Sequence, residues 1–514
     1  MVSQVISGTT VGIDGYKIII ETDIAGGLPT IAMVGLPDTA INEARERIRS
    51  AFRNSGLNFP IHKVVINLAP ADLKKEGSGY DLPMAVGILV ANGEIEQAKL
   101  ENSAFIGELS LDGSIRGIAG VLPITLGLKE QGIKRIFVPK DNAPEAALVD
   151  DVEIFAVSHL CELLEFFSDN KIPEFKMQPY KVNIKEFLSD NFAEELLYDF
   201  KDVKGQHKAK RALEIAAAGG HNILMVGSPG SGKTLLSKCF TGILPPLELS
   251  EAMELTKIYS ISGLLEKDKP LVTKRPFRSV HHSASAIGIT GGGSNPKPGE
   301  ITLAHRGILF LDEVVEFPRN VLEVLRQPLE DGVVHITRAQ TSIKYPADFT
   351  LLAAMNPCPC GHHGDSGKEC TCSPFQIQRY WSKLSGPLLD RIDMQINVPR
   401  LNEEELLSQG EAESSKSIRE RVIKARNIQI ERFKDENIVC NSQMLPKQIK
   451  RYCEIDDTTK MVLKNAITKF NLSGRAYDRI LKLSRTIADL DNSEKIETKH
   501  ILEAIQYRNL DRQN

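Results

Sequence analysis

The sequence lacks long hydrophobic runs, has a single tryptophan and carries almost no net charge. No apolar stretch approaches the roughly 18 residues that a membrane-spanning helix needs. The first residues lack the basic segment and apolar core of a secretory signal. The 63 Lys and Arg residues nearly balance 67 Asp and Glu residues, so any nucleic-acid contact has to be local or repeated around an oligomer. We therefore expect a cytoplasmic protein with no membrane partner.

Cysteine is also scarce, with eight residues in 514. A reducing compartment disfavours disulfides, so we expect these thiols to bind metal or to be buried. Four lie within fifteen residues as two C-x-C pairs, Cys358 with Cys360 and Cys370 with Cys372. The other four are isolated, and we interpret them as packing residues: Cys161, Cys239, Cys440 and Cys453.

The two C-x-C pairs could form a tetrahedral thiolate site for a structural zinc ion. C-x-C is less usual than C-x-x-C in such sites, and His362 and His363 between the pairs are candidate substitute ligands. The alternative interpretation is a loop of reduced cysteines without metal.

A chain of this length suggests about three domains. Residues 1–168 alternate strand and helix patterns, and residues 169–196 are polar, contain two prolines and are typical of a linker. Residues 197–400 contain the motifs described below, and residues 401–514 have helical periodicity. We expect a multidomain α/β protein.

The first unit has clear local signals. Apolar periodicity predicts a helix over residues 39–55, and a second helix over residues 81–91 has proline in its first turn. The run KVVINLAP (63–70) predicts a buried strand. Asp112-Gly113 predicts the turn of a hairpin over residues 105–115. These signals indicate a compact α+β unit.

The central segment contains a phosphate-binding loop. The sequence GSPGSGKT follows the apolar run 222–226 and precedes a helical pattern, which is the strand–loop–helix context that this motif requires. Backbone N–H groups of such a loop surround a polyphosphate. The predicted ATP-binding residues are Gly227, Ser228, Pro229, Gly230, Ser231, Gly232, Lys233 and Thr234. Lys233 is expected to reach the β- and γ-phosphates, and Thr234 to hold Mg²⁺.

Two later strands end in polar side chains suited to hydrolysis. ILFLDE (308–313) predicts a strand followed by Asp312, which would orient Mg²⁺, and Glu313, which would activate water as a general base. LLAAMNP (351–357) ends in Asn356, a candidate sensor of the γ-phosphate or the attacking water. The alternatives are a solvated acidic pair and a turn-forming Asn-Pro.

The first unit resembles the proteolytic domain of Lon-type proteases, a ribosomal S5 domain 2-like fold. The resemblance lies in GELSLDGSIRGIAGVL, in GIKRIFVPKDN and in the spacing back to KKEGSGYDLPMA. The nucleophilic serine of that family would fall at Gly79 and its lysine at Leu122, so the catalytic dyad is missing. We expect a non-proteolytic domain that serves assembly or substrate contact.

The central segment resembles the AAA+ ATPases with a helix-2 insert. In LLDRID, Arg391 matches the arginine finger that acts on ATP bound to a neighbouring subunit, the alternative being a local salt bridge to Asp390 or Asp393. Arg475 lies at the sensor-2 position, with Arg479 as the fallback. The helical C-terminal segment resembles the lid that covers the nucleotide.

Two insertions mark this subclass. The first contains the glycine-rich GITGGGSNPKPGE, and the second, over residues 330–349, alternates as a β-hairpin before the Asn356 strand. Lys297, Arg338 and Lys344 on these insertions are candidate DNA-phosphate contacts in the pore of a ring. The alternative is that they are solvated loop charges.

Together, the Lon-like domain, the SVHHSAS and NPCPCG segments of the core and the helical lid resemble the ComM/YifB family of magnesium-chelatase-like AAA+ ATPases over nearly the whole chain. The usual proline before HHS is Val280 here. The resemblance implies ATP, Mg²⁺, a homohexamer and a helicase that acts on single-stranded or branched DNA during natural transformation. Two alternatives stay open: a chelatase-type ATPase that remodels a protein for metal insertion, and an unfoldase for a protease.

Overall fold

The computed structural model describes residues 2–35, 38–73, 75, 77–168, 177–189, 197–293, 296–337, 342–365, 367–401, 412–436, 438–470 and 473–508. The chain forms two compact units. The first contains Met1–Phe192 and Glu248–Thr273, and the second contains Ala193–Leu247 and Lys274–Asn514. Among the described residues, no helix has the length and apolar character needed to cross a bilayer.

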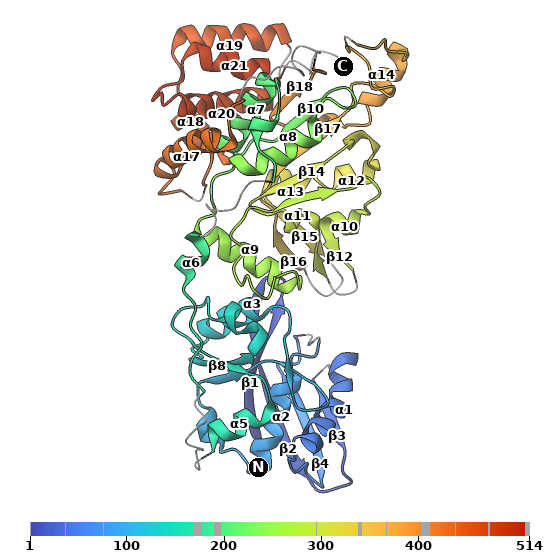
Figure 1. Ribbon diagram of the computed structural model, residues 1–514, viewed down its shortest axis with the longest axis vertical. Coiled ribbons are helices and arrows are strands. Elements are labelled where there is room, and N and C mark those ends of the chain that lie inside the picture. Colours follow the sequence, from blue (N-terminus) through green and yellow to red (C-terminus); the bar gives the residue numbers. More distant parts are fainter. Residues whose placement is uncertain are drawn as a thin grey trace. The chain divides into compact units, whose positions relative to one another are not determined.

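The first unit is built on a mixed seven-stranded sheet with the order β3-β4-β2-β1-β5-β8-β9 (Figure 1). Its strands are β1 Ser3–Val11, β2 Asp14–Ala25, β3 Ile31–Val34, β4 Lys63–Ala69, β5 Ser103–Phe105, β8 Arg135–Pro139 and β9 Glu153–Val157. β2 runs antiparallel to β1 and β4, whereas β5, β8 and β9 follow β1 in parallel. A separate small hairpin pairs β6 (Glu108–Leu109) with β7 (Ile115–Arg116).

Alternation along these strands produces two cores, one on each face of the sheet. On β8, Phe137 packs in a cluster with helices α1, α2 and α5, whereas its neighbours Ile136 and Val138 pack in a second cluster with α3 and α4. The helices are α1 Thr39–Asn54, α2 Asp81–Ala91, α3 Val121–Glu130, α4 Ala143–Ala146 and α5 Leu160–Phe167. The predicted helices and the 63–70 strand are confirmed to within one residue at an end. The turn predicted at Asp112-Gly113 is also confirmed, but its hairpin spans residues 108–116 and not 105–115.

One segment of the central sequence folds with the first unit. Helix α9 (Leu249–Ile261) packs on α3, and the Ser260 carbonyl accepts a hydrogen bond of 3.1 Å from the Gly120 N–H. Buried Glu145 accepts hydrogen bonds from the Ser260 hydroxyl and from the Leu122 N–H. The chain therefore leaves the second unit after Leu247 and returns to it at Lys274. The expected boundaries describe a continuous core over residues 197–400, whereas the compact units are discontinuous in sequence.

The segment expected to be a linker has some regular structure where it is described. Tyr180 forms an antiparallel bridge with Ile154 at the end of the first sheet, and α6 (Ile184–Ser189) is helical. The rest of residues 169–196 lies largely outside the described ranges.

The second unit contains a five-stranded parallel sheet with the order β11-β14-β17-β10-β18. The strands are β10 Ile223–Val226, β11 Phe277–Val280, β14 Ile308–Leu311, β17 Thr350–Met355 and β18 Met394–Asn397. All four residues of β10 and of β14 are buried, as expected for central strands that are covered on both faces. The predicted α/β class and the parallel sheet are confirmed.

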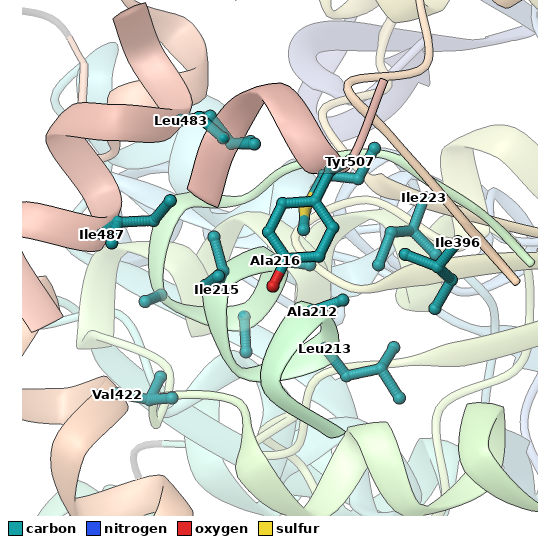
Figure 2. Close-up of a cluster of buried hydrophobic side chains, with 14 of the residues drawn as sticks. Ala212, Leu213, Ile215, Ala216, Ile223, Ile396, Val422, Leu483, Ile487 and Tyr507 are labelled. Atoms are coloured by element: carbon teal, nitrogen blue, oxygen red, sulfur yellow. The ribbon is translucent and has the colours of Figure 1, made fainter. Parts of the chain in front are cut away.

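The C-terminal helices share one core with the first helix of this unit. Figure 2 shows Ile223 and Ile396 of the sheet, Leu213 and Ala216 of α7, and Leu483 of α20 within this cluster. The helices of this face are α7 His207–Gly219, α8 Lys233–Phe240, α17 Ser415–Arg432, α18 Pro446–Tyr452, α19 Asp457–Phe470, α20 Gly474–Leu490 and α21 Thr498–Gln506. The expected helical character of the described residues after 411 is confirmed, and its function as a lid stays a prediction.

The opposite face of the sheet is covered by shorter elements. They include α10 Ala286–Thr290, α11 Glu300–Leu303, α12 Arg319–Glu323, α13 Arg326–Asp331, α14 Pro374–Trp381 and α15 Gly386–Leu389. The first insertion contains a two-residue ladder between β12 (Gly291–Gly292) and β13 (Lys297–Pro298). The second is the predicted antiparallel hairpin of β15 (Val333–Thr337) and β16 (Ser342–Pro346), which is confirmed.

Candidate functional site

The predicted phosphate-binding and hydrolytic residues meet at the carboxyl edge of the parallel sheet. β17 lies between β10 and β14 in the sheet, so the loops that follow these three strands are neighbours at one edge. Ligands of open α/β sheets bind at this edge, beyond the carboxyl ends of the strands. The strand order thus brings the Gly227–Thr234 loop, Asn356 and Asp312 together, although they are up to 129 residues apart in sequence.

Lys233 is held at the start of α8 by the loop itself. Its ammonium donates hydrogen bonds to the carbonyls of Gly227 at 2.7 Å and Ser228 at 3.0 Å, and to Asn356 Oδ1 at 3.3 Å. Burial lowers the pKa of Lys233, although the nearby charge of Asp312 opposes the shift. An ammonium at the N-terminus of a helix that follows a glycine-rich loop is positioned to bind an anion such as a phosphate.

Thr234 and Asp312 form a pair of hard oxygen ligands. The Thr234 hydroxyl donates a 2.9 Å hydrogen bond to Asp312 Oδ2, and the Glu313 N–H donates to Oδ1 at 2.9 Å. Mg²⁺ is usually bound by one or two such groups together with substrate phosphates. The residues present therefore fit Mg²⁺ with a nucleotide.

Glu313 is placed where a general base would face solvent. Its side chain is 57% exposed, and its backbone is left-handed, with φ 50° and ψ 47°. A non-glycine residue in this region is uncommon and tends to occur at functional sites. His282, just beyond β11, lies 4.0 Å from the Glu313 carboxylate.

Two amide side chains connect this edge to its surroundings. Asn356 follows β17 and contacts Lys233, as a γ-phosphate sensor would. Gln206, at the start of α7, donates to the carbonyls of Pro399 at 2.7 Å and Ser231 at 3.4 Å. The loop is therefore tied to the strand end at Pro399 as well as to its own lysine.

Arg391 follows α15 and is paired within its own chain. Its guanidinium donates to Glu330 and, at 2.8 Å, to the Pro387 carbonyl. The sequence predicts Asp390 or Asp393 as the partner of a local salt bridge, whereas Arg391 pairs with Glu330 of α13, 61 residues earlier. Its Nε is buried and has no hydrogen-bond partner among the described residues.

The two sensor-2 candidates on α20 have different environments. Arg475 in the first turn is exposed and makes no hydrogen bond or ion pair with any residue that the structure describes. Arg479, one turn later, donates to the Ile392 carbonyl at 3.2 Å and lies 3.5 Å from Asp393. Arg479 therefore has a structural partner, whereas Arg475 is available for a ligand.

The four clustered cysteines converge on one point. All four sulfurs lie within 4.8 Å of one another, and three of the separations are 3.3, 3.6 and 3.7 Å. Sulfurs bound at about 2.3 Å to a tetrahedral zinc ion would be about 3.8 Å apart. The cluster of Cys358, Cys360, Cys370 and Cys372 therefore has the dimensions of a thiolate metal site. Backbone N–H groups of His362 and Thr371 lower the pKa of Cys360 to about 5, which favours the thiolate form that binds metal, whereas burial and the neighbouring sulfurs raise the pKa of Cys370 and of Cys372.

We expect the purified protein to contain about one zinc ion per chain after washing with a weak chelator. The Cys360→Ser/Cys372→Ser protein should lose this zinc, because only two sulfur ligands remain. Elemental analysis measures the zinc, and Cys161→Ser is the matched control because Cys161 is distant from the cluster in sequence. An unchanged zinc content in the double variant would rule out the site.

The candidate DNA-contacting lysines lie on two insertions that contact each other. Lys297 on β13 and Lys344 on β16 are both exposed. Next to them in sequence, the Tyr345 hydroxyl donates a 2.9 Å hydrogen bond to the Pro296 carbonyl. Arg338 lies outside the described residues, so its place in the hairpin stays a prediction.

In the first unit, the positions of the Lon dyad are filled by packing. A Cβ at Gly79 would lie 2.7 Å from Ile118 Cδ1, and Leu122 is fully buried. The adjacent Ser78 hydroxyl donates to Glu108. A serine at position 79 would therefore compete with Ile118 for space.

Comparisons with known proteins identify the family. Family models described as magnesium chelatase subunit ChlI, subunit ChlI of Mg-chelatase and magnesium chelatase subunit ChlI C-terminal match residues 199–406, 20–142 and 412–508. Competence protein ComM of Haemophilus influenzae is 42% identical over 507 residues, covering 98% of this chain and 97% of that protein. The protein YifB of Escherichia coli is 42% identical over 503 residues, covering 98% and 96%.

The chain belongs to the ComM/YifB family of magnesium-chelatase-like proteins. The expected family is thus confirmed. This ComM/YifB chain is also 29% identical to Lon protease 2 of Bacillus subtilis over 144 residues, which is 27% of this chain and 25% of that protein. That similarity bears out the Lon resemblance in part.

Sequence reasoning missed three contacts of this ComM/YifB chain. Glu330 pairs with Arg391, His282 approaches Glu313, and Asp365 is hydrogen-bonded to Ser228 of the phosphate-binding loop. Each joins residues that are distant in sequence, and none has a motif spacing. For these three contacts, the sequence offers one signal: Asp365 lies between the two cysteine pairs and so belongs to a candidate metal-binding segment.

Proposed function

We propose that this chain is an ATP-hydrolysing AAA+ motor that acts on DNA as a homohexamer, as a helicase or branch-migration factor in recombination or natural transformation. The observation that supports it most is the 42% identity to a competence protein over 98% of this chain. The convergence of Lys233, Thr234, Asp312 and Asn356 at one sheet edge supports ATP and Mg²⁺ as the ligands.

In this proposal, each residue at the edge has one task. Lys233 leaves the loop carbonyls for the β- and γ-phosphates, and Thr234 and Asp312 hold Mg²⁺, which neutralises phosphate charge when bound. Glu313 accepts the proton of the attacking water, which Asn356 orients. Arg391 and Arg475 stabilise the charge that develops on the transferred phosphoryl group, with Arg391 acting on ATP bound to the neighbouring subunit.

The DNA contact is assigned to the two joined insertions. Lys297 and Lys344 are exposed near the Tyr345–Pro296 hydrogen bond, and Arg338, which lies outside the described residues, is a third candidate cation. The chain has a net charge of −4, so a local phosphate contact repeated by six subunits is the physical route to DNA affinity.

We expect forked DNA to stimulate ATP hydrolysis severalfold, with DNA binding that weakens as salt rises. Steady-state phosphate release with and without forked DNA measures this effect, and Lys233→Ala is the blank. If forked DNA neither binds nor changes the rate, the DNA-motor function is wrong.

The assignment of the insertions has its own test. Lys297→Ala/Lys344→Ala should weaken forked-DNA binding and make it less salt-dependent by about one unit of slope per lost phosphate contact. ATP hydrolysis without DNA should be unchanged. The control is Lys450→Ala/Lys464→Ala, two exposed lysines on α18 and α19. Equal losses in both double variants would mean that the insertions have no special role.

A second candidate is a chelatase-type ATPase that remodels a protein partner for metal insertion. The matching family models favour this function, because they describe a subunit of magnesium chelatase. It predicts no effect of DNA on hydrolysis, and stimulation by a partner with a metal-binding domain. The forked-DNA assay therefore separates the two functions.

A further inference from the structure

The cysteine loop, residues 356–372, contacts the phosphate-binding loop directly. It begins at Asn356, whose side chain contacts Lys233. At Gly361 the backbone is left-handed, with φ 85°, and a Cβ there would lie 2.7 Å from Pro229 Cδ and 2.8 Å from Pro229 Cγ. The backbone of the cysteine loop thus packs against the phosphate-binding loop with no room for a side chain.

Asp365 forms the second contact between the two loops. Its side chain is 1% exposed and accepts hydrogen bonds from the Gly367 N–H at 2.9 Å and from the Ser228 hydroxyl, and His362 Nδ1 lies 3.3 Å away. These partners lower the pKa of Asp365 to about 2, so it is a carboxylate at neutral pH. The Ser228 carbonyl in turn accepts from Lys233, so Asp365 is two contacts from the phosphate-binding amine.

The cysteine loop is ordered by isolated contacts, such as the hydrogen bonds from Trp381 to the Pro357 carbonyl and from the Gly361 N–H to the Cys358 carbonyl, and not, in its described residues, by a helix or strand of its own. Between Met355 and Pro374, the described residues, which exclude Ser366, form no helix or strand. The segment also contains three glycines, Gly361, Gly364 and Gly367. Thiols are weak hydrogen-bond partners, so four of them without metal would hold the segment loosely. Fixing such a segment costs conformational entropy at every residue. An ion bound by the four sulfurs would supply the missing constraint.

We propose that a zinc ion bound by Cys358, Cys360, Cys370 and Cys372 holds the phosphate-binding loop in its nucleotide-binding geometry, through Asp365–Ser228 and Gly361–Pro229. The zinc ion then increases the affinity of the phosphate-binding loop for nucleotide, in addition to stabilising the cysteine loop. This inference rests on the proposed function only in that Lys233 binds a nucleotide, and it does not depend on DNA.

The test begins with equilibrium binding of a fluorescent ADP analogue, MANT-ADP, to zinc-loaded protein and to protein stripped with a strong chelator. We expect stripped protein to bind about tenfold or more weakly, because hydrogen bonds to a charged group are lost. Adding zinc back should restore the affinity. The single Trp381 donates a 3.0 Å hydrogen bond to the Pro357 carbonyl, so its fluorescence reports independently whether the loop has changed.

Two variants distinguish loss of the zinc ion from loss of the Asp365–Ser228 contact between the two loops. Cys360→Ser/Cys372→Ser should lose both zinc and affinity, whereas the matched Cys161→Ser/Cys440→Ser should keep both. Asp365→Ala should keep zinc and lose affinity, and Glu369→Ala is its control, because Glu369 is an exposed carboxylate in the same loop.

The outcomes are distinct. If stripped protein keeps its circular dichroism spectrum and binds MANT-ADP unchanged, the inference is wrong. If stripping unfolds the protein, Asp365→Ala decides, because it retains the zinc: unchanged affinity overturns the inference, and reduced affinity supports it. If zinc-loaded wild type binds no more MANT-ADP than Lys233→Ala, the proposed function itself fails.

Discussion

Replacing Glu313 with glutamine is expected to lower ATP turnover by about 10²–10⁴-fold, because glutamine cannot accept a proton from the attacking water. Nucleotide binding should persist, since the described hydrogen bonds of the Lys233 and Thr234 side chains go to Gly227, Ser228, Asn356 and Asp312, and not to the Glu313 carboxylate. Phosphate release measures turnover, and MANT-ATP binding measures affinity. We therefore expect slow phosphate release together with unchanged MANT-ATP affinity.

Glu316→Gln is the matched control for this substitution. Glu316 lies three residues later, is partly exposed and has Lys383 as its partner at 3.4 Å. Its change removes the same charge from the same surface, so turnover should stay close to wild type. If Glu313→Gln retained more than about a tenth of the activity, its role as general base would have to be abandoned.

Replacing Arg391 with alanine is expected to lower turnover by about 10³–10⁵-fold if it acts as an arginine finger. The competing explanation is structural, because Arg391 pairs with Glu330 in the same chain. Glu330→Gln breaks that pair and leaves the arginine in place. A finger predicts that Glu330→Gln remains active, whereas a structural pair predicts that both variants lose stability and activity alike.

Mixing subunits tests whether Arg391 acts between chains. Lys233→Ala cannot bind ATP productively but retains Arg391, and Arg391→Ala binds ATP but lacks the finger. If sites are shared, the mixture should hydrolyse ATP faster than either variant alone, because some sites receive Lys233 from one chain and Arg391 from the next. A mixture no more active than the sum of its parts would place Arg391 within its own chain's function.

The local structure of this chain follows from its sequence to a large extent. Helices α1 and α2, the 63–69 strand and the hairpin at Asp112-Gly113 have apolar periods and turn residues that act over a few positions. The phosphate-binding loop is similar, because its glycines and Lys233 are contiguous. The extra pairing at Tyr180 and the short α6 were not predicted, because neither has a strong local signal.

The contacts between distant segments could not be predicted in the same way. Helix α9 lies in the central part of the sequence, yet it packs on α3, and its Ser260 hydroxyl donates a hydrogen bond to buried Glu145 of α4. Its composition fits either unit, since an apolar helical face does not specify which surface covers it. The same applies to Asp365, whose partner Ser228 is 137 residues earlier.

The sequence by itself determined the candidate chemistry: a lysine in a phosphate-binding motif, a threonine and an aspartate suited to Mg²⁺, a carboxylate, an amide and four clustered thiols. Only the tertiary structure decided how these groups meet. Placing β17 between β10 and β14 puts Asn356 beside Lys233 and brings Asp312 to Thr234. It also gives Arg391 its partner Glu330 and sets the cysteine loop against Pro229. The physical reason is that side-chain periodicity fixes which face of an element is buried, whereas strand order and packing fix what that face meets.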